Sequence, residues 1–287
     1  MSNKDTSFTN IPRSMDCNGK TLDFESPRIM GILNITPDSF YDGGKYSEKD
    51  LMIKQCERMI YEGAHIIDLG AFSSRPGADF ISVEEEKQRL LPVLEILSRK
   101  FPETIFSVDT FRSEIAKQAH NYGADIINDI SGGNMDDNMF KTMSEIKIPY
   151  ILMHMKGNPQ TMQKEAIEEN VVEIVKSFFK TKVKELNDLG VYNIILDPGY
   201  GFGKSLKSNY ELLKCQEELR IENLPVVAGL SRKTMIYKLL NNKPEDALTG
   251  TITLNILALQ NGANILRVHD VKEAMQSIKL LEYYKSI

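Results

Sequence analysis

The sequence predicts a (β/α)8 TIM barrel of the α/β class, and three observations support that fold. Short apolar runs rich in β-branched residues recur eight times, each run stops at polar residues, and segments with helical periodicity lie between the runs. Near-continuous apolar strands are typical of burial on both faces, and their alternation with helices favours parallel pairing. An open doubly wound sheet would usually have fewer strands and a glycine-rich first turn, which this chain lacks.

The predicted strands follow this pattern along the whole chain. They are residues 28–34, 65–70, 105–110, 125–131, 150–155, 193–199, 225–231 and 265–270. Apolar residues at helical spacing mark the segments between them. Two such sets are Met52, Cys56, Met59 and Ile60, and Ile167, Val171, Ile174, Val175 and Phe178. Because no linker or change in composition divides these units, we expect a single domain.

Ahead of the first strand, residues 17–27 contain an Asn18-Gly19 turn between two short runs. Asn-Gly is a strong signal for a tight β-hairpin. We therefore expect a short N-terminal β-hairpin that closes the N-terminal end of the barrel. This interpretation divides the chain into an N-terminal extension, residues 1–16, expected to be disordered, and a barrel domain, residues 17–287.

Composition and charge exclude several classes of function. The 287 residues carry a formal net charge of −5, and basic residues do not interleave with aromatic ones, which argues against nucleic-acid binding. The N-terminus lacks an apolar signal segment, and no run reaches the length of a membrane helix. Three separated cysteines, Cys17, Cys56 and Cys215, fit reduced thiols better than a disulfide framework. We therefore expect a cytoplasmic protein that binds neither nucleic acid nor membranes.

Polar residues stand near the predicted carboxyl ends of all eight strands, where a barrel carries its active site. They are Asn34, Asp68, Asp109, Asn128, Asp129, His154, Asp197, Ser231, Arg232, Lys233, Arg267 and His269. Each one alone is also typical of a helix cap or a turn. Together they indicate a polar ligand such as a flat heterocycle, because buried carboxylates and amides are costly without partners. The ring around that ligand would comprise Asp109, Asn128, Asp197 and Lys233.

Two polar loops follow the first two strands. The first, residues 36–44, carries Asp38, Asp42 and a pair of glycines, and the second, residues 72–79, carries Arg75-Pro76-Gly77. Both are long enough to fold over a ligand, with glycine as hinge and proline as stiffener, although surface turns have the same composition.

Two further motifs bear on anion binding. Residues 201–205, GFGKS, lack the spacing of a phosphate-binding loop, so that interpretation is rejected. Residues 231–234 instead lie at a strand-to-helix junction, where free backbone N–H groups favour an anion such as a carboxylate.

Taken in order, the motifs resemble one known family. They read MGILNITPDSF, SSRPGA, SVDT, NDISGG, LMHMKGNPQTMQ, LDPGYGFGK, GLSRKTMI and RVHDV, and they span nearly the whole chain. In order and spacing they are similar to dihydropteroate synthases, which join 6-hydroxymethyl-7,8-dihydropterin pyrophosphate to p-aminobenzoate in folate biosynthesis. The resemblance implies a transferase that forms 7,8-dihydropteroate and releases diphosphate.

The resemblance also implies roles for individual residues. The pterin would contact Asp109, Asn128, Met153, Asp197, Phe202, Lys233 and Arg267. The diphosphate would contact Asn34, Ser74, Arg267 and His269. The p-aminobenzoate would contact Phe40, Ser74, Arg75, Pro76, Lys233 and Thr234. The implied cofactor is Mg²⁺, bridging Asn34 and phosphate oxygens, which suits a hard cation that keeps most of its waters.

Two positions depart from the common family pattern. Ser74 stands where threonine is usual, and Thr234 stands where serine is usual. Both residues keep a hydroxyl, so the resemblance still implies a substrate contact for Ser74, whereas the lost methyl group puts its packing in question.

In the implied mechanism, loss of diphosphate leaves a cation at the pterin methylene, which the amine captures. Such chemistry needs the leaving anion neutralised and the cation shielded from water. The residues expected to take part are Asp109, Lys233, Arg267, His269, Asp42 and Arg75. We hypothesise that the 36–44 and 72–79 loops close over bound diphosphate and so form the p-aminobenzoate site. No general base is assigned, because an aniline nitrogen is nucleophilic at neutral pH.

Two alternatives stay open. A methyltetrahydrofolate-dependent methyltransferase on the same barrel would keep the pterin contacts but has no need of two loops that bind diphosphate. A non-catalytic pterin-binding paralogue would be expected to lose Lys233, Arg267 or His269, which this chain retains. The family resemblance further suggests a homodimer formed through helices near residues 246–262 and 271–285.

Overall fold

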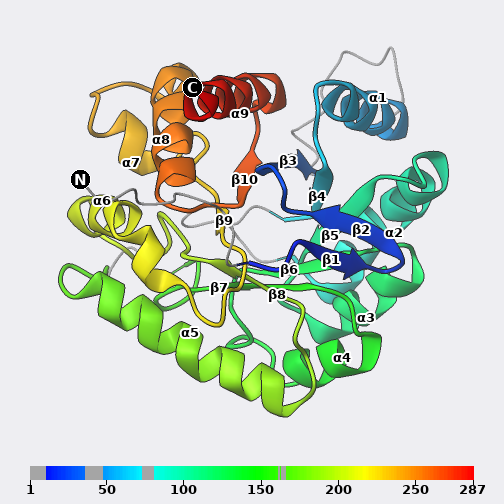
Figure 1. The fold of residues 1–287 in the computed structure, drawn as a ribbon. Helices are drawn as coiled ribbons and strands as arrows, with labels where there is room; N and C mark the ends of the chain where they lie inside the picture. The colour runs from blue at the N-terminus through cyan, green and yellow to red at the C-terminus, as the bar shows by residue number, and fades with distance from the viewer. Residues whose placement is uncertain (1–10, 36–47, 73–80, 161, 163–165) are drawn as a thin grey trace.

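The computed structural model describes residues 11–35, 48–72, 81–160, 162 and 166–287, and within them parallel strands form a barrel surrounded by helices (Figure 1). The barrel strands are β3 (Arg28–Asn34), β4 (Ile66–Gly70), β5 (Ile105–Asp109), β6 (Ile126–Asp129), β7 (Tyr150–Met153), β8 (Ile194–Asp197), β9 (Val227–Ala228) and β10 (Ile265–Val268). The helices are α1 (Glu48–Tyr61), α2 (Val83–Lys100), α3 (Ser113–Asn121), α4 (Met139–Ile146), α5 (Val171–Asp188), α6 (Leu206–Lys214), α7 (Thr234–Tyr237), α8 (Leu248–Gln260) and α9 (Val271–Ser286). The predicted barrel is confirmed.

Strand order follows the chain around the barrel. The strands pair in parallel in the order β8-β7-β6-β5-β4-β3-β10-β9, and a bridge between Leu196 and Val226 joins the two ends of this sheet. The Leu196 N–H also donates to the Pro225 carbonyl at 2.8 Å. The sheet therefore curls until its first and last strands meet.

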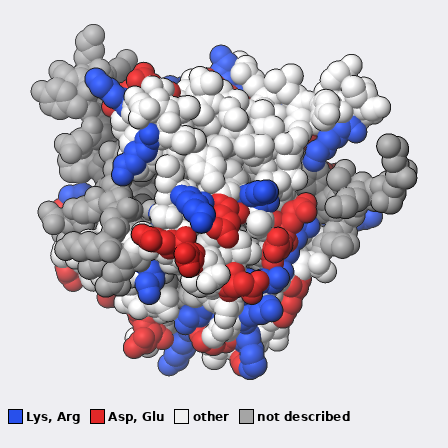
Figure 2. All heavy atoms as spheres, turned by 90° about the vertical axis from the view of Figure 1, so that its left-hand side faces the viewer, with Lys and Arg blue, Asp and Glu red and all other residues white. Residues whose placement is uncertain are grey.

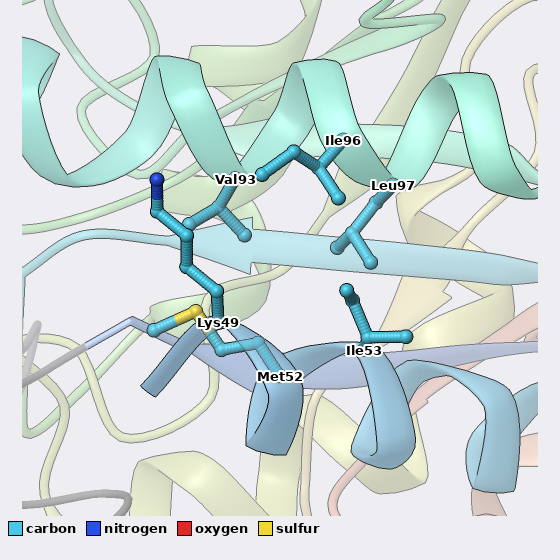
Figure 3. A pocket seen from close by; sticks show the side chains of 6 residues that line it. All are labelled: Lys49, Met52, Ile53, Val93, Ile96 and Leu97. Carbon is cyan, nitrogen blue, oxygen red and sulfur yellow. The ribbon is translucent and has the colours of Figure 1, made fainter. Parts of the chain in front are cut away.

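The helices form because their apolar residues recur every three or four positions and pack on the outside of the sheet. Helices α1 and α2 show this packing between neighbours. The side chains that line the gap between them are Lys49, Met52, Ile53, Val93, Ile96 and Leu97 (Figure 3). Helix α2 begins where Ser82 accepts the Glu85 N–H at 3.1 Å, which satisfies one of the free N–H groups of the first turn.

A two-stranded antiparallel hairpin precedes the barrel, as the sequence predicts. Its strands are β1 (Ser14–Cys17) and β2 (Lys20–Asp23). Asn18 and Gly19 connect them with φ angles of 56° and 86°. Two successive positive φ angles are the requirement of a tight hairpin turn, which explains the Asn-Gly pair.

The hairpin covers an apolar layer at the N-terminal end of the barrel. One inward residue from each strand builds this layer, namely Met30, Ile66, Ile105, Ile126, Ile151, Ile195, Val227 and Ile265. Met15, Leu22 and Phe24 pack against it, and each is at most 5% exposed. The expected closure of this end by the hairpin is therefore confirmed.

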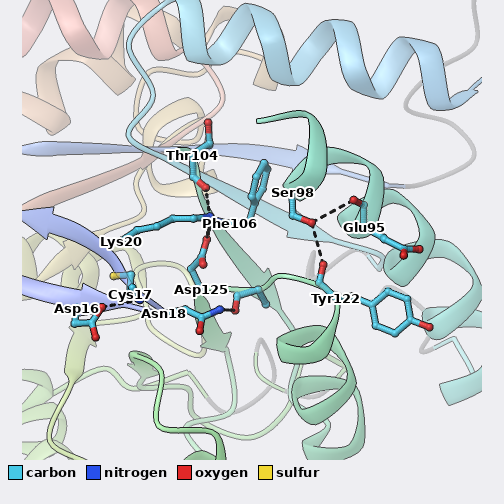
Figure 4. A network of polar contacts seen from close by, with 12 residues as sticks. Asp16, Cys17, Asn18, Lys20, Glu95, Ser98, Thr104, Phe106, Tyr122 and Asp125 are labelled. Atoms are coloured by element: carbon cyan, nitrogen blue, oxygen red, sulfur yellow. Dashed lines mark hydrogen bonds and ion pairs between the residues drawn. The ribbon is translucent and has the colours of Figure 1, made fainter. Parts of the chain in front are cut away.

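Polar contacts also fix the hairpin to the barrel (Figure 4). Lys20 Nζ donates to Asp125 Oδ2 and to the Thr104 carbonyl, both at 2.7 Å. The same Asp125 oxygen accepts the Phe106 N–H at 2.8 Å. Burial raises the pKa of Asp125, and the Lys20 ammonium opposes that shift by stabilising the carboxylate.

Two elements differ from the sequence-based expectation. Ile167 lies outside α5 and forms a parallel bridge with Lys204, because Asn170 adopts a left-handed conformation, φ 55°, just before the helix begins. Strand β9 is much shorter than the expected 225–231, because the chain leaves the sheet to form a loop in which Arg232 has a φ of 54°. In the ranges that the structure describes, no helix has the length and apolar character needed to cross a bilayer.

Candidate active site

One layer above the apolar layer, the inside of the barrel becomes polar. Side chains two residues further along a strand point the same way. The next inward layer therefore consists of Ile32, Asp68, Ser107, Asn128, Met153, Asp197, Gly229 and Arg267. Asp68, Ser107, Asn128 and Asp197 are each at most 5% exposed. Their burial is unfavourable unless they pair with one another or with a ligand.

Arg267 links two carboxylates across the inside of the barrel. From β10, its Nε donates to Asp68 Oδ2 at 2.7 Å and its Nη2 donates to Asp109 Oδ2 at 2.9 Å. Asn128 Nδ2 donates to the same Asp68 oxygen at 3.1 Å. Burial raises the pKa of Asp109 to about 8, and the Arg267 guanidinium opposes that shift. The guanidinium thus holds both acids in place around the centre of the barrel.

Three buried oxygen atoms inside this end of the barrel have no partner among the described residues. They are Asp68 Oδ1, Ser107 Oγ and Asp109 Oδ1, from the neighbouring strands β4 and β5. The register places Asp68 beside Ser107, and Gly70 beside Asp109. Buried polar atoms are rarely left without partners, so this group indicates a ligand or ordered water with several hydrogen-bonding groups.

Lys233 and Asp197 form the other side of the polar layer. Lys233 Nζ donates to the Tyr200 carbonyl and lies 4.7 Å from the centre of the Phe202 ring. Asp197 Oδ1 accepts the Gly199 N–H at 2.7 Å. Burial lowers the pKa of Lys233 to about 8, and the negative charge of Asp197 opposes that lowering. Asp197 and Lys233 are thus close enough for the carboxylate to influence the pKa of the lysine.

An apolar rim lines the part of the mouth formed by the segments that follow β4 to β8. Its members are Phe72, Phe111, Ile130, Met153, Met155 and Met162, with Phe202 packed against them. Phe72 and Phe111 meet edge to face with ring centroids 5.5 Å apart. A polar layer beneath an apolar, partly aromatic rim suits a flat heterocycle with donors and acceptors on its edge.

Asn34 ends β3 at the same mouth. A Cβ at Gly70 would lie 3.8 Å from Asn34 Oδ1 and 3.9 Å from Asp109 Oδ2, so the two oxygens face a shared space. A hollow of about 430 Å³ opens beside Asn34. It is lined by Ile32, Leu33, Asn34, Leu51, Lys54, Gln55 and Arg58. The two basic side chains of α1 bring positive charge to this side of the barrel.

The donors at Asn34 limit which metal could bind there. Among the described residues, no three His, Cys, Asp or Glu side chains gather as a metal cluster. One amide oxygen fits Mg²⁺ that keeps several waters and takes phosphate oxygens as further ligands. The same donor set does not form a cage that would hold the ion without a phosphate.

His269 and Thr234 lie at the edge of this mouth. His269 Nδ1 lies 3.0 Å from Ser231 Oγ, which also accepts the His269 N–H at 3.2 Å. Thr234 is the first residue of α7, and its Oγ1 lies 2.8 Å from the Tyr237 hydroxyl. The loop after β9 is therefore tied to the end of β10.

Two of the polar strand-end residues point away from the inside of the barrel. Asp129 accepts the Tyr150 hydroxyl at 2.6 Å and the Gly133 N–H at 2.9 Å. His154 meets Phe178 of α5 edge to face, with ring centroids 5.0 Å apart. Each follows an inward residue in the chain, so each projects to the outer face and stabilises the fold there. Neither residue belonged to the ring that the sequence predicts around the ligand.

The remaining expected contacts lie outside the described residues. They are Phe40, Asp42, Ser74, Arg75 and Pro76, from the loops after β3 and β4. The described residues next to these loops, Ile35 and Phe72, are both buried.

The structure brings the other expected pterin contacts together at the carboxyl end of the barrel. They are Asp109, Asn128, Met153, Asp197, Phe202, Lys233 and Arg267. Two further residues lie at the same end: Asp68, which the sequence placed among the polar strand-end residues without an assigned contact, and Ser107, which it did not single out. The sequence could have indicated Ser107, because it precedes Asp109 by two residues in β5 and so lies on the same face of the strand.

The fold and the site define a class, namely barrel proteins suited to bind a small polar heterocycle at the carboxyl ends of their strands. Comparison with known proteins sharpens that description. Residues 30–269 match the pterin binding enzyme family. The dihydropteroate synthase of Escherichia coli K12 is 42% identical over 266 residues, which cover 92% of this chain and 94% of that protein.

Solved structures share the fold along nearly the whole chain. The Xanthomonas albilineans dihydropteroate synthase with 4-aminobenzoic acid has a TM-score of 0.89 at 35% identity, covering 96% of this chain and 99% of that one. The same enzyme in complex with 7,8-dihydropteroate has a TM-score of 0.86 at 33% identity, with the same coverage. The chain therefore belongs to the dihydropteroate synthase family.

Proposed function

We propose that this protein catalyses the dihydropteroate synthase reaction. The C–O bond between the pterin methylene and diphosphate breaks, a C–N bond to p-aminobenzoate forms, and the amine releases one proton to solvent. The products are 7,8-dihydropteroate, diphosphate and a proton. The observation that carries this proposal is the buried polar layer at the strand ends, in a chain that aligns over 92% of its length with an E. coli synthase.

The polar layer would bind the pterin. In this proposal Asp109 and Asp197 accept hydrogen bonds from ring N–H groups, while Asn128 and Lys233 contact the remaining edge. The support is that buried oxygens on β4 and β5 have no partner among the described residues, so the layer is incomplete without a ligand. The ring would lie between Met153 and the Arg267 side chain.

Positive charge at one side of the pterin would stabilise the leaving diphosphate. Arg267 is 19% exposed and so can be reached from the mouth, and His269 follows two residues later on the same strand end. Asn34 would help to hold Mg²⁺, and the ion would supply further positive charge to the leaving group. The apolar rim around Phe72 and Phe202 would keep water from the methylene cation.

We further propose that the 36–44 and 72–79 loops close over bound diphosphate, with Asp42 and Arg75 as charged contacts. Both loops start from strands, β3 and β4, whose ends lie at the mouth. Alanine at Asp42 or Arg75 is expected to raise the KM for p-aminobenzoate. Unchanged turnover and unchanged p-aminobenzoate binding in both variants would contradict closure.

The reaction is tested by mixing purified protein with dihydropterin pyrophosphate and Mg²⁺, with and without p-aminobenzoate. Diphosphate release and dihydropteroate, the latter followed by chromatography, are expected in equal amounts and only when the amine is present. Tight pterin binding without product would contradict the synthase and support a methyltransferase or a binding paralogue.

We also propose a homodimer formed through α8 and α9. Exposed apolar side chains on these helices are Leu257, Leu280, Tyr283 and Tyr284. Figure 2 shows a largely uncharged area in the upper part of the face, where Figure 1 places α7 and α8. Light scattering should give a mass near twice 32.6 kDa, and Leu280→Glu should lower it.

The cytoplasmic location and the absence of nucleic-acid and membrane partners stay predictions.

A further inference from the structure

Lys204, in the loop between β8 and α6, is a buried lysine that none of the expected substrate contacts accounts for. Lys204 is only 4% exposed. Its Nζ donates to the carbonyls of Gly199 at 2.8 Å, Phe202 at 3.1 Å and His154 at 3.2 Å. An ammonium has three N–H donors, so each donor has one carbonyl to bind. Such complete pairing is what makes a buried ammonium tolerable.

The three carbonyls belong to two different loops. His154 follows β7, whereas Gly199 and Phe202 follow β8. Glycines let these loops touch through their backbones. A Cβ at Gly199 would collide with the His154 carbonyl oxygen. A Cβ at Gly203 would likewise lie 2.6 Å from the Lys156 carbonyl oxygen. The ammonium therefore sits where the two loops meet.

A second set of contacts holds the β8 loop from the outside. Asn209 of α6 accepts the Gly201 N–H at 2.6 Å and donates to the Lys204 carbonyl at 3.1 Å. Ile167 donates its N–H to the Gly203 carbonyl at 2.9 Å. The loop is thus fixed on one side by Asn209 and on the other by the Lys204 ammonium.

These loops carry parts of the proposed pterin site. Met153 directly precedes His154, and its Cγ lies 3.2 Å from the position a Gly199 Cβ would take. Phe202 packs against the apolar rim. The carbonyl of Tyr200, in the same loop, accepts from Lys233 Nζ. The positions of Met153, Phe202 and Lys233 therefore depend on how the two loops are joined.

We propose that Lys204 is a positioning residue for the pterin site, whose ammonium joins the β7 and β8 loops and so sets the spacing of Met153, Phe202 and Lys233. This inference rests on the proposed function. Lys204 donates to backbone carbonyls and does not touch the substrate, so it acts through the loops. The alternating glycines of the GYGFGK sequence are then explained as the backbone that brings these carbonyls to one ammonium.

The test compares Lys204→Met with the wild-type protein. Methionine keeps the apolar stem and removes the three donors. The control is Lys207→Met, because Lys207 is an exposed lysine in the first turn of α6. The probes are 6-hydroxymethylpterin, followed by its fluorescence, and inorganic diphosphate with Mg²⁺, followed by calorimetry. The KM for dihydropterin pyrophosphate and kcat are measured separately.

In Lys204→Met we expect the Kd for the pterin to rise about tenfold or more, because small displacements of flanking groups are costly. The KM for dihydropterin pyrophosphate should rise with it. The Kd for diphosphate should change by less than about twofold, since its proposed contacts lie on other strands. Lys207→Met should change none of these three constants.

Several results would overturn the inference. An unchanged pterin Kd in folded Lys204→Met would do so, and so would an equal loss of pterin and diphosphate binding, which marks a general structural role. If Lys204→Met does not fold, Asn209→Ala replaces it, with an expected pterin-selective rise of about threefold to fivefold. No selective rise in that variant would equally overturn the inference.

The outcomes also separate this inference from the proposed function. Wild-type protein that binds the pterin but forms no dihydropteroate would refute the synthase activity, while the variant comparison would still decide the role of Lys204. Wild-type protein that binds no pterin would refute both.

Discussion

The two ends of the barrel are built from the same strands but serve different roles. At the N-terminal end the inward residues are apolar and meet the hairpin, whereas one layer higher five of the eight are polar. On β4 the step runs from Ile66 to Asp68, and on β8 it runs from Ile195 to Asp197. Each step spans two residues, roughly 7 Å along a strand. Stability and ligand binding are therefore assigned to adjacent layers of one core, which makes the two separable by substitution.

The largest effect is expected at the polar layer, from Arg267→Met. This change leaves Asp68 and Asp109 buried without their shared cation. We expect kcat/KM to fall about 10²–10³-fold because a group proposed to stabilise the leaving diphosphate is lost. We also expect the free energy of unfolding to fall by about 3 kcal/mol. Initial rates and urea unfolding measure the two effects.

The matched control adds Asp68→Asn to Arg267→Met. Removing one of the buried carboxylates should recover part of the free energy of unfolding without restoring turnover. Wild-type turnover in Arg267→Met would contradict the proposed role of this side chain.

The apolar layer should show the opposite behaviour. Ile126→Ala removes a fully buried side chain beneath the hairpin and is expected to lower the free energy of unfolding by about 2–4 kcal/mol. The KM values for both substrates should stay as in the wild type at a temperature where the variant is folded. A weaker pterin affinity in folded Ile126→Ala would show that the two layers are not separable.

A smaller loss of stability is expected where the hairpin meets the barrel. Lys20→Met leaves the Asp125 carboxylate, 2% exposed, without the ammonium, while the Phe106 N–H of β5 still donates to it. We expect the free energy of unfolding to fall by about 1–3 kcal/mol with unchanged kinetics. The double variant Lys20→Met with Asp125→Asn should recover part of that loss, and no recovery would argue against the ion pair as the cause.

The smallest effect on the free energy of unfolding is expected from His154, on the outer face of the barrel, and this effect depends on pH. Burial, with the nearby Lys204 ammonium, lowers the pKa of His154 to about 2. Between that value and the ordinary histidine pKa of about 6.5, the unfolded chain binds a proton that the folded protein does not. Stability contributed by this residue is therefore lost as the pH falls below about 6.5.

We expect the wild type to lose about 1–2 kcal/mol more than His154→Leu between pH 7 and pH 5. Urea unfolding at both pH values measures this difference. His65, whose pKa burial lowers to about 4, is present in both proteins and cancels in the comparison. Identical pH dependence in the two proteins would contradict the assignment of His154 to the fold.

Much of the fold follows from local sequence. The run RIMGILN predicts β3 with the bounds that the structure has, because a strand buried on both faces is apolar almost throughout. The Asn18-Gly19 pair likewise predicts the hairpin, because few residues tolerate two positive φ angles. Strand β9 was predicted too long, because the left-handed Arg232 that follows it has no clear signal in composition.

The sequence predicted at which end of the barrel the polar residues lie better than it predicted which way their side chains point. Polar residues at strand ends marked the end of the barrel where buried oxygens lack partners among the described residues, but Asp129 and His154 face outward while Asp68 faces inward. The alternation of side chains along each strand decides this, once the register is known. The contacts of Lys204 could not be predicted, because they depend on how two loops separated by about fifty residues approach each other.

The separation of the two layers is tested most directly on β8, where Ile195 and Asp197 both point inward from one strand. The measurement is the rate of dihydropteroate formation, per mole of folded protein, by Ile195→Ala and Asp197→Asn. We expect Asp197→Asn to lower kcat/KM for dihydropterin pyrophosphate by about 100-fold, and Ile195→Ala to stay within about twofold of the wild type. Equal losses in the two variants, or a wild-type rate in Asp197→Asn, would contradict the assignment of pterin binding to the polar layer.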